Sequence, residues 1–149
     1  MLDVLILIES ISRNFALFSG ALFAGAATYV SLVERPAIAE GGVNLANSYL
    51  MFSQPRPLVF QSSFAGIGGL SGILAGLTAA HAWWLTGGLI LLSAALFNIF
   101  IIAPEARKLV RDGEGTDKEV LPRLLSLTRH YAIQSIAGLA ALFIFVMGS

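Results

Sequence analysis

An unbroken run of 48 residues without charge limits the fold of this sequence more than any other feature. Residues 57–104 contain no Asp, Glu, Lys or Arg, and residues 14–33 and 130–149 are free of them as well. A helix needs about 20 apolar residues to cross a bilayer, so the long run has room for two crossings and a turn. Together with the two shorter runs, it predicts four transmembrane helices.

The composition agrees with a protein that is dissolved in lipid. Of the 149 residues, 56% are hydrophobic and 12% are charged, and the mean hydropathy is +0.80. A water-soluble domain of this size needs a mostly polar surface, which so few charged residues would not supply. We therefore expect a single all-α membrane domain over residues 1–149, embedded in the lipid bilayer.

The expected fold is a bundle of four transmembrane helices near residues 15–33, 58–80, 83–103 and 128–147. Two long loops, 34–57 and 104–127, join the first helix to the second and the third to the fourth. Pro36 and Pro104 are expected to end the first and third helices, because proline lacks the amide donor that helix continuation needs. Residues 1–12 are apolar but short, and they either extend the first helix or lie along the membrane surface.

The positions of Lys and Arg predict the orientation. Eight of the nine lie in or beside the two long loops, and only Arg13 lies at the other end of the helices. Short loops rich in Lys and Arg stay on the cytosolic side of a membrane. We expect both long loops in the cytosol, both termini outside, and a location in a bacterial inner membrane.

Small residues recur every four positions on two of the helices. The first helix carries Ala16, Gly20, Ala24 and Thr28, and the second carries Gly68, Gly72, Gly76 and Ala80. Such ridges let helix backbones approach closely in lipid. Gly20, Gly68, Gly72 and Gly76 are therefore candidate packing residues, either inside the bundle or against another membrane protein.

The sequence also contains a trace of repetition. Gln61-Ser62-Ser63-Phe64-Ala65-Gly66-Ile67 resembles Gln134-Ser135-Ile136-Ala137-Gly138-Leu139 with one residue skipped. Each segment opens a helix that follows a proline-ended helix and a long loop. Two parallel two-helix repeats would explain this pattern.

Polar residues gather at the cytosolic ends of the expected helices. Asn98 lies six residues before Pro104, hence about 9 Å inside the third helix at about 1.5 Å per residue. A pocket with an apolar floor and a polar mouth would suit a lipid, a quinone, a pigment or an aromatic small molecule. The candidate ligand-binding residues are Tyr29, Gln61, Asn98, His130 and Gln134. The alternative is that nearby charged residues, Glu34, Arg35, Arg56 and Arg129, only mark the lipid headgroup boundary.

Several classes of site are not expected. The net charge is zero and no basic stripe is present, so nucleic acid is not an expected partner. The absence of cysteine excludes disulfides, iron–sulfur clusters and thiolate zinc sites. No group of His and carboxylate residues has metal-ligand spacing, so neither a metal nor another cofactor is expected.

Residues 21–37, ALFAGAATYVSLVERPA, resemble the first helix of the anthrone-oxygenase-like family of small membrane proteins. The likeness continues through Ser48-Tyr49, Gln61-Ser62, Ile102-Ala103-Pro104 and Arg107-Lys108-Leu109. It implies a four-helix membrane fold and, in some members, a cofactor-independent oxidation of polycyclic phenols such as anthrones. Under that reading His130, Tyr131 and Asn98 are the catalytic candidates.

The chain departs from this family at the positions best suited to chemistry. Where the family tends to have Pro-Thr-Asn, the chain has Pro104-Glu105-Ala106. Where the family's last helix tends to carry Trp, His and Arg, the aligned residues are Leu127, Tyr131 and Gln134. We therefore expect a non-catalytic accessory subunit that packs among other membrane protein subunits and has a ligand pocket at its cytosolic end. The alternative is an oxygenase that acts on a polycyclic aromatic substrate.

Overall fold

The computed structural model describes residues 2–42, 45–46, 48–49, 55–111 and 117–149. All regular secondary structure in this part of the chain is helical. Four helices are long and apolar enough to cross a membrane, namely Asp3–Glu40, Arg56–Ala79, Ala82–Leu109 and Val120–Met147. The prediction of an all-α four-helix bundle is confirmed, and the chain is an integral membrane protein.

The first long helix consists of α1 (Leu2–Tyr29), the π-helical turn η1 (Val30–Glu34) and α2 (Arg35–Glu40). The second is α4 (Pro55–Ala79). The third consists of α5 (Ala82–Phe97), a second π-helical turn η2 (Asn98–Ile102) and α6 (Ala103–Arg111), and the fourth is α7 (Asp117–Met147). Both α1 and α5 pack against α4 and α7, so α1 lies diagonally across the bundle from α5.

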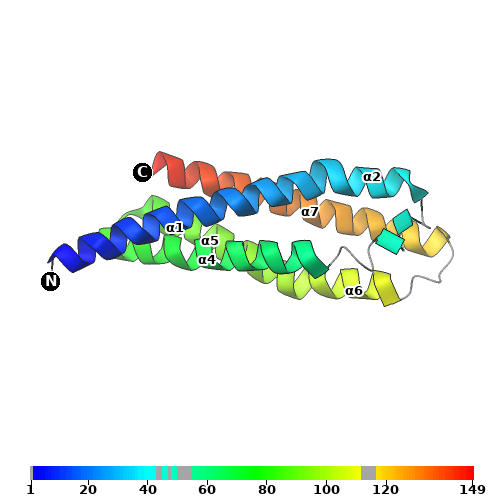
Figure 1. Ribbon diagram of the computed structural model, residues 1–149, viewed down its shortest axis with the longest axis horizontal. Helices are drawn as coiled ribbons and strands as arrows, with labels where there is room; N and C mark the ends of the chain where they lie inside the picture. Colours follow the sequence, from blue (N-terminus) through cyan, green and yellow to red (C-terminus); the bar gives the residue numbers. More distant parts are fainter. Residues whose placement is uncertain (1, 43–44, 47, 50–54, 112–116) are drawn as a thin grey trace.

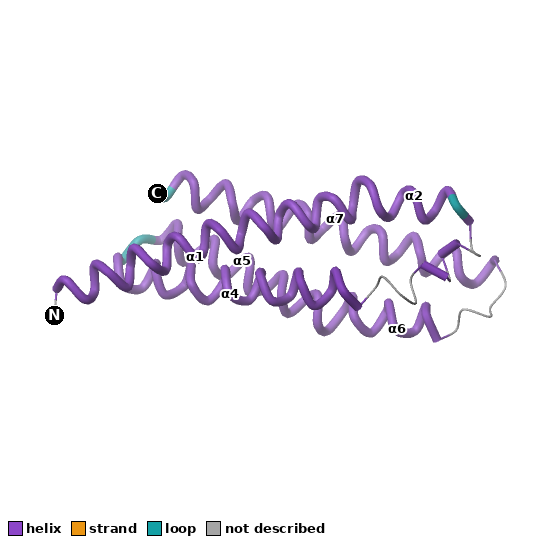
Figure 2. Tube along the Cα trace, viewed as in Figure 1, coloured by secondary structure: helices purple, strands orange, loops and turns teal. Residues whose placement is uncertain are grey.

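The two ends of the bundle differ (Figure 1). Both chain termini and the turn between α4 and α5 lie at one end, called here the terminal end (Figures 1 and 2). The other end, called the loop end, carries α2, α6 and the start of α7. The turn at the terminal end is tight because Ala80 adopts a left-handed conformation, with φ of 54°, and the His81 amide donates to the Gly76 carbonyl at 3.1 Å.

The helices are longer than the sequence predicts. Residues 2–12 extend α1, which settles the choice between an extended helix and a separate surface segment. The expected ends at Pro36 and Pro104 are wrong, because helix continues through both prolines into α2 and α6. The segments 34–57 and 104–127, expected as loops, are therefore helical over much of their described length.

The π-helical turns explain how helix continues through proline. A proline clashes with the carbonyl four residues before it and donates no hydrogen bond. Both π turns lie just before a proline, and in each the closing amide bonds five residues back: Arg35 to the Val30 carbonyl, and Ala103 to the Asn98 carbonyl. The wider turn relieves the clash. Each π turn ends two residues before its proline, η1 before Pro36 and η2 before Pro104.

Glycines allow α4 and α5 to touch along their backbones. A Cβ atom on Gly72 would lie 2.9 Å from the Gly88 Cα atom, and one on Gly76 would lie 2.6 Å from the Leu85 amide nitrogen. A Cβ on Gly68 would meet Leu91 at 2.9 Å, whereas one on Gly20 would meet the same side chain at an ordinary 3.4 Å. The glycine ridge of α4 thus faces the interior of the bundle, against α5 and α7.

Candidate functional site

Buried polar side chains form a layer across the bundle, towards the loop end. The layer separates an apolar cluster around Phe23, Leu91 and Phe145 from a second apolar cluster around Ile102, Leu124 and Leu127. All four long helices contribute to this polar layer, through Ser31, Gln61, Asn98 and Gln134, each of which is buried. Polar groups at such a depth need hydrogen-bonding partners, because lipid supplies none.

Hydrogen bonds within the layer join neighbouring helices at one level along the bundle. The Asn98 amide nitrogen in η2 donates to the Ser62 hydroxyl of α4 at 3.0 Å. The hydroxyls of Thr28 and Ser135 lie 3.0 Å apart and join α1 to α7. The Gln134 amide nitrogen donates to the Ala94 carbonyl at 3.1 Å and joins α7 to α5. The contacts of η2 with α4, of α1 with α7 and of α5 with α7 therefore each carry a hydrogen bond within this layer.

The layer also contains amide atoms that no protein group satisfies. Gln61 is fully buried, and neither atom of its amide has a hydrogen-bond partner. The side-chain oxygens of Asn98 and Gln134 are likewise buried and without a partner. Leaving a buried polar group unpaired costs about 1–3 kcal/mol, so these amide atoms reduce the stability of the bundle unless buried water satisfies them.

Arg35 lies inside the bundle beside this layer. Its guanidinium is 4.5 Å from the centre of the Tyr131 ring, and both residues have an exposed fraction of 0%. Arg35 therefore faces the interior of the bundle, and its place at the headgroup boundary stays a prediction. The position next to Pro36 and the π turn places this arginine on the inner face of the helix, where an aromatic ring shields its charge.

His130 lies at the edge of the bundle. Its Nδ1 atom is 2.7 Å from a carboxylate oxygen of Glu105 in α6, and its ring meets Phe97 edge-on with the centres 5.5 Å apart. The exposed fractions of the two side chains are 23% for His130 and 40% for Glu105. This pair ties α6 to α7 at the loop end.

The candidate residues from the sequence thus fall into three groups. Gln61, Asn98 and Gln134 face the interior, with Tyr131 beside Arg35. His130 is only half-buried and contacts Glu105 rather than the polar layer. Tyr29 has an exposed fraction of 59% and points away from the layer, although Thr28 next to it points in. His130, Tyr131 and Asn98 contact different neighbours and do not line one described pocket.

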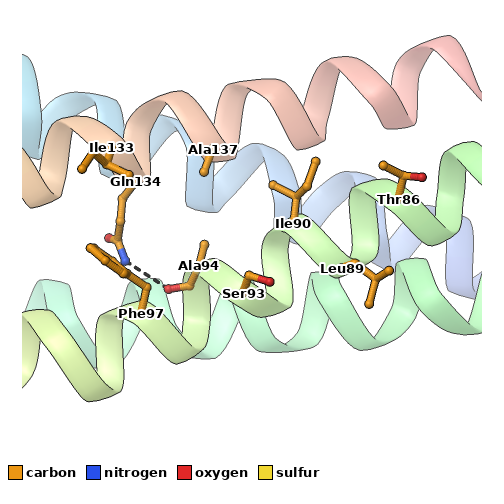
Figure 3. A pocket seen from close by; sticks show the side chains of 9 residues that line it. All are labelled: Thr86, Leu89, Ile90, Ser93, Ala94, Phe97, Ile133, Gln134 and Ala137. Atoms are coloured by element: carbon orange, nitrogen blue, oxygen red, sulfur yellow. Dashed lines mark hydrogen bonds between the residues drawn. The ribbon is translucent and has the colours of Figure 1, made fainter.

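A groove between α5 and α7 adjoins the layer (Figure 3). Its volume is about 410 Å³, and the lining residues are Thr86, Leu89, Ile90, Ser93, Ala94, Phe97, Ile133, Gln134 and Ala137. The lining is mostly apolar, and the buried Gln134 amide lies beside Phe97 at one end (Figure 3). Of the residues chosen from the sequence, only Gln134 lines this groove.

Sequence reasoning missed the α5 wall of the groove. Thr86, Ile90, Ser93 and Phe97 follow one another at intervals of three or four residues, so they share a face of the helix. The two hydroxyls, seven residues apart in an otherwise apolar span, are the signal that could have identified this face.

The described residues contain no group of three or more His, Asp or Glu side chains that could hold a metal ion. The chemistry that the site offers is hydrogen bonding from amides and hydroxyls at the end of an apolar groove. Comparisons with protein-family models, with curated proteins and with solved structures found no match to this chain.

Proposed function

We propose that this protein is a non-catalytic membrane subunit that holds a lipophilic small molecule in the groove between α5 and α7. One observation carries the proposal. The groove has a mostly apolar lining, with the hydroxyl residues Thr86 and Ser93 on α5 and the buried Gln134 at one end. Sites for small molecules combine an apolar lining with a few placed polar groups in this way.

The distribution of Lys and Arg supports a proposed location and orientation in the membrane. The loop end carries eight of the nine Lys and Arg residues, which favours the cytosolic side and hence an inner-membrane protein whose two termini lie outside. The groove would then open to lipid in the cytosolic half of the bilayer. A ligand would enter from the membrane, which suits a lipid, a quinone, a pigment or another aromatic compound.

A partner protein would contact a surface other than the glycine ridge of α4. Gly68, Gly72 and Gly76 all meet neighbouring helices of the same chain. The loop end presents exposed cations that could contact an acidic surface of a partner, namely Arg56, Arg107, Lys108 and Arg129. This supports an accessory subunit that docks at its loop end.

The oxygenase alternative receives less support. It requires His130, Tyr131 and Asn98 to surround one substrate, whereas their contacts go to Glu105, Arg35 and Ser62 respectively. An oxygen-consumption assay with a polycyclic phenol tests it directly. Turnover that is lost in the His130→Ala variant would overturn the non-catalytic assignment.

Purification from the native membrane in a mild detergent tests the proposal. Mass spectrometry of the purified protein should find a bound lipophilic molecule and stoichiometric partner chains. The variant Ala137→Phe places a ring in the groove and should lose the small molecule. Ala140→Phe is the matched control, because Ala140 lies on the exposed face of the same helix. Equal amounts of the molecule in both variants would contradict the groove as its site, and a clean monomer would contradict a role as a subunit.

A further inference from the structure

A second groove lies on the outer face of α4, called here the α4 groove. Its volume is about 580 Å³, and all of its lining residues belong to this one helix, namely Arg56, Val59, Phe60, Ser63 and Phe64. Their spacing of i, i+3, i+4, i+7 and i+8 places them on one side of the helix. Val59 has an exposed fraction of 67% and Phe60 one of 43%, so a molecule in the surrounding lipid can reach this lining directly.

The two phenylalanines give the α4 groove an apolar wall. Their ring centres are 4.5 Å apart, with an angle of 51° between the ring planes. Phe64 also packs against the apolar cluster around Phe23 and Leu91, which holds its ring in place. The eight residues from Arg56 to Phe64 rise by about 12 Å at about 1.5 Å per residue. The groove therefore offers an apolar surface of that length to an extended hydrocarbon chain.

Arg56 lies at one end of the α4 groove, where the membrane-spanning part of α4, Arg56–Ala79, begins. Its side chain is exposed, and no ion pair or hydrogen bond joins it to the described residues. No Asp or Glu lines the groove. An arginine at the end of a membrane span can reach the level of the lipid headgroups, and its planar guanidinium fits a phosphate. A positive charge thus stands at the headgroup end of an apolar groove.

We propose that the α4 groove binds one anionic phospholipid, with the lipid phosphate at Arg56 and an acyl chain along Phe60 and Phe64. This inference goes beyond the proposed function, because it assigns a second ligand to a different face of the bundle. The single positive charge complements a headgroup whose net charge is negative. The ammonium group of a zwitterionic headgroup finds no carboxylate among the lining residues, so the groove prefers the anionic lipid.

The test uses the full chain in a mild detergent and two lipids with identical acyl chains, phosphatidylglycerol and phosphatidylcholine. Native mass spectrometry during a titration with each lipid gives the number of bound lipids and the dissociation constant. The wild type should bind one phosphatidylglycerol molecule more tightly than phosphatidylcholine by about fivefold, the ratio expected for one cation at an anionic headgroup.

Two pairs of variants separate the charge from the groove. Arg56→Gln removes the charge and should abolish the preference for phosphatidylglycerol. Arg107→Gln is the matched control and should keep the preference, because Arg107 is an exposed cation of the loop end that lines none of the described pockets. Ser63→Phe fills the α4 groove and should weaken the binding of both lipids. Leu77→Phe should not, because Leu77 is exposed near the other end of the same helix.

Several results would overturn the inference. Equal affinities of the wild type for the two lipids, or a preference that Arg56→Gln retains, would show that Arg56 does not select the headgroup. A preference that Arg107→Gln also abolishes would assign it to the total charge of the loop end. Unchanged binding in Ser63→Phe, or binding that Ala137→Phe removes, would place the lipid outside the α4 groove. None of these results contradicts a ligand between α5 and α7, so the inference and the proposed function fail separately.

Discussion

The guanidinium of Arg35 lies 4.5 Å from the centre of the Tyr131 ring, and neither residue is exposed. The contact joins the start of α2 to the middle of α7, at the level where the π turn η1 carries the first long helix past Pro36. A charge inside a membrane protein is costly, and the face of an aromatic ring is one of the few uncharged surfaces that attract a cation. The contact therefore stabilises the loop end of the bundle.

Replacing the ring should destabilise the protein markedly. We expect Tyr131→Leu to lower the free energy of unfolding by about 2–4 kcal/mol, through lost packing and loss of the cation–π contact. Thermal unfolding in detergent, followed by tryptophan fluorescence, measures the change. Tyr29→Leu is the control, because Tyr29 has an exposed fraction of 59% and should tolerate the change. Similar losses in the two variants would show that burial at Tyr131 is not the cause.

The close contact of α4 with α5 makes a second prediction. A Cβ on Gly88 would lie 2.5 Å from the Ile73 amide nitrogen and 2.8 Å from the Gly69 carbonyl oxygen. Gly88→Ala must push two helix backbones apart, at a cost of about 1–3 kcal/mol in the free energy of unfolding. Gly66→Ala meets nothing within 4 Å and should be neutral or slightly stabilising, since alanine favours helix. A Gly88→Ala variant with the same free energy of unfolding as the wild type would contradict the close approach of α4 and α5.

The fold could be predicted because charge is so costly in lipid that its absence marks the membrane spans. The candidate site was predicted only in part. A residue's place along a helix gives its depth, and on that basis Tyr29 and Gln134 were equally good candidates. The face on which each lies depends on the neighbouring helices, and only Gln134 points into the bundle.

Arg35 also shows that the sequence alone does not predict which way a side chain faces. A charge next to proline at a helix end indicates a headgroup boundary, yet the helix continues and the side chain turns inward. The π turns that allow this have no reliable signature in the sequence, because a proline is as consistent with a helix end as with a wide turn. The groove between α5 and α7 arises from two distant segments, so no local pattern predicts it.

The two glutamines of the polar layer should respond differently to substitution. Gln61→Met removes an amide that has no partner, so the free energy of unfolding should stay the same or rise by up to about 1 kcal/mol. Gln134→Met loses the bond to the Ala94 carbonyl and should cost about 0.5–1.5 kcal/mol. Thermal unfolding of both variants provides the comparison. A loss in Gln61→Met as large as that in Gln134→Met would show that a bound water or ligand satisfies Gln61.

The orientation of the bundle can be tested by labelling, because the chain has no cysteine and every introduced thiol is unique. Lys108 is exposed at the loop end, and His81 is exposed in the turn at the terminal end. With eight of the nine Lys and Arg residues at the loop end, Lys108→Cys should react with a membrane-impermeant maleimide only after the cells are opened. His81→Cys should react on intact cells, and the parent chain should not react at all. Losing Lys108 leaves seven of the eight charges, so the substitution itself should not invert the protein. The reverse labelling pattern would show that the loop end, and with it the groove and Gln134, lies in the outer half of the membrane.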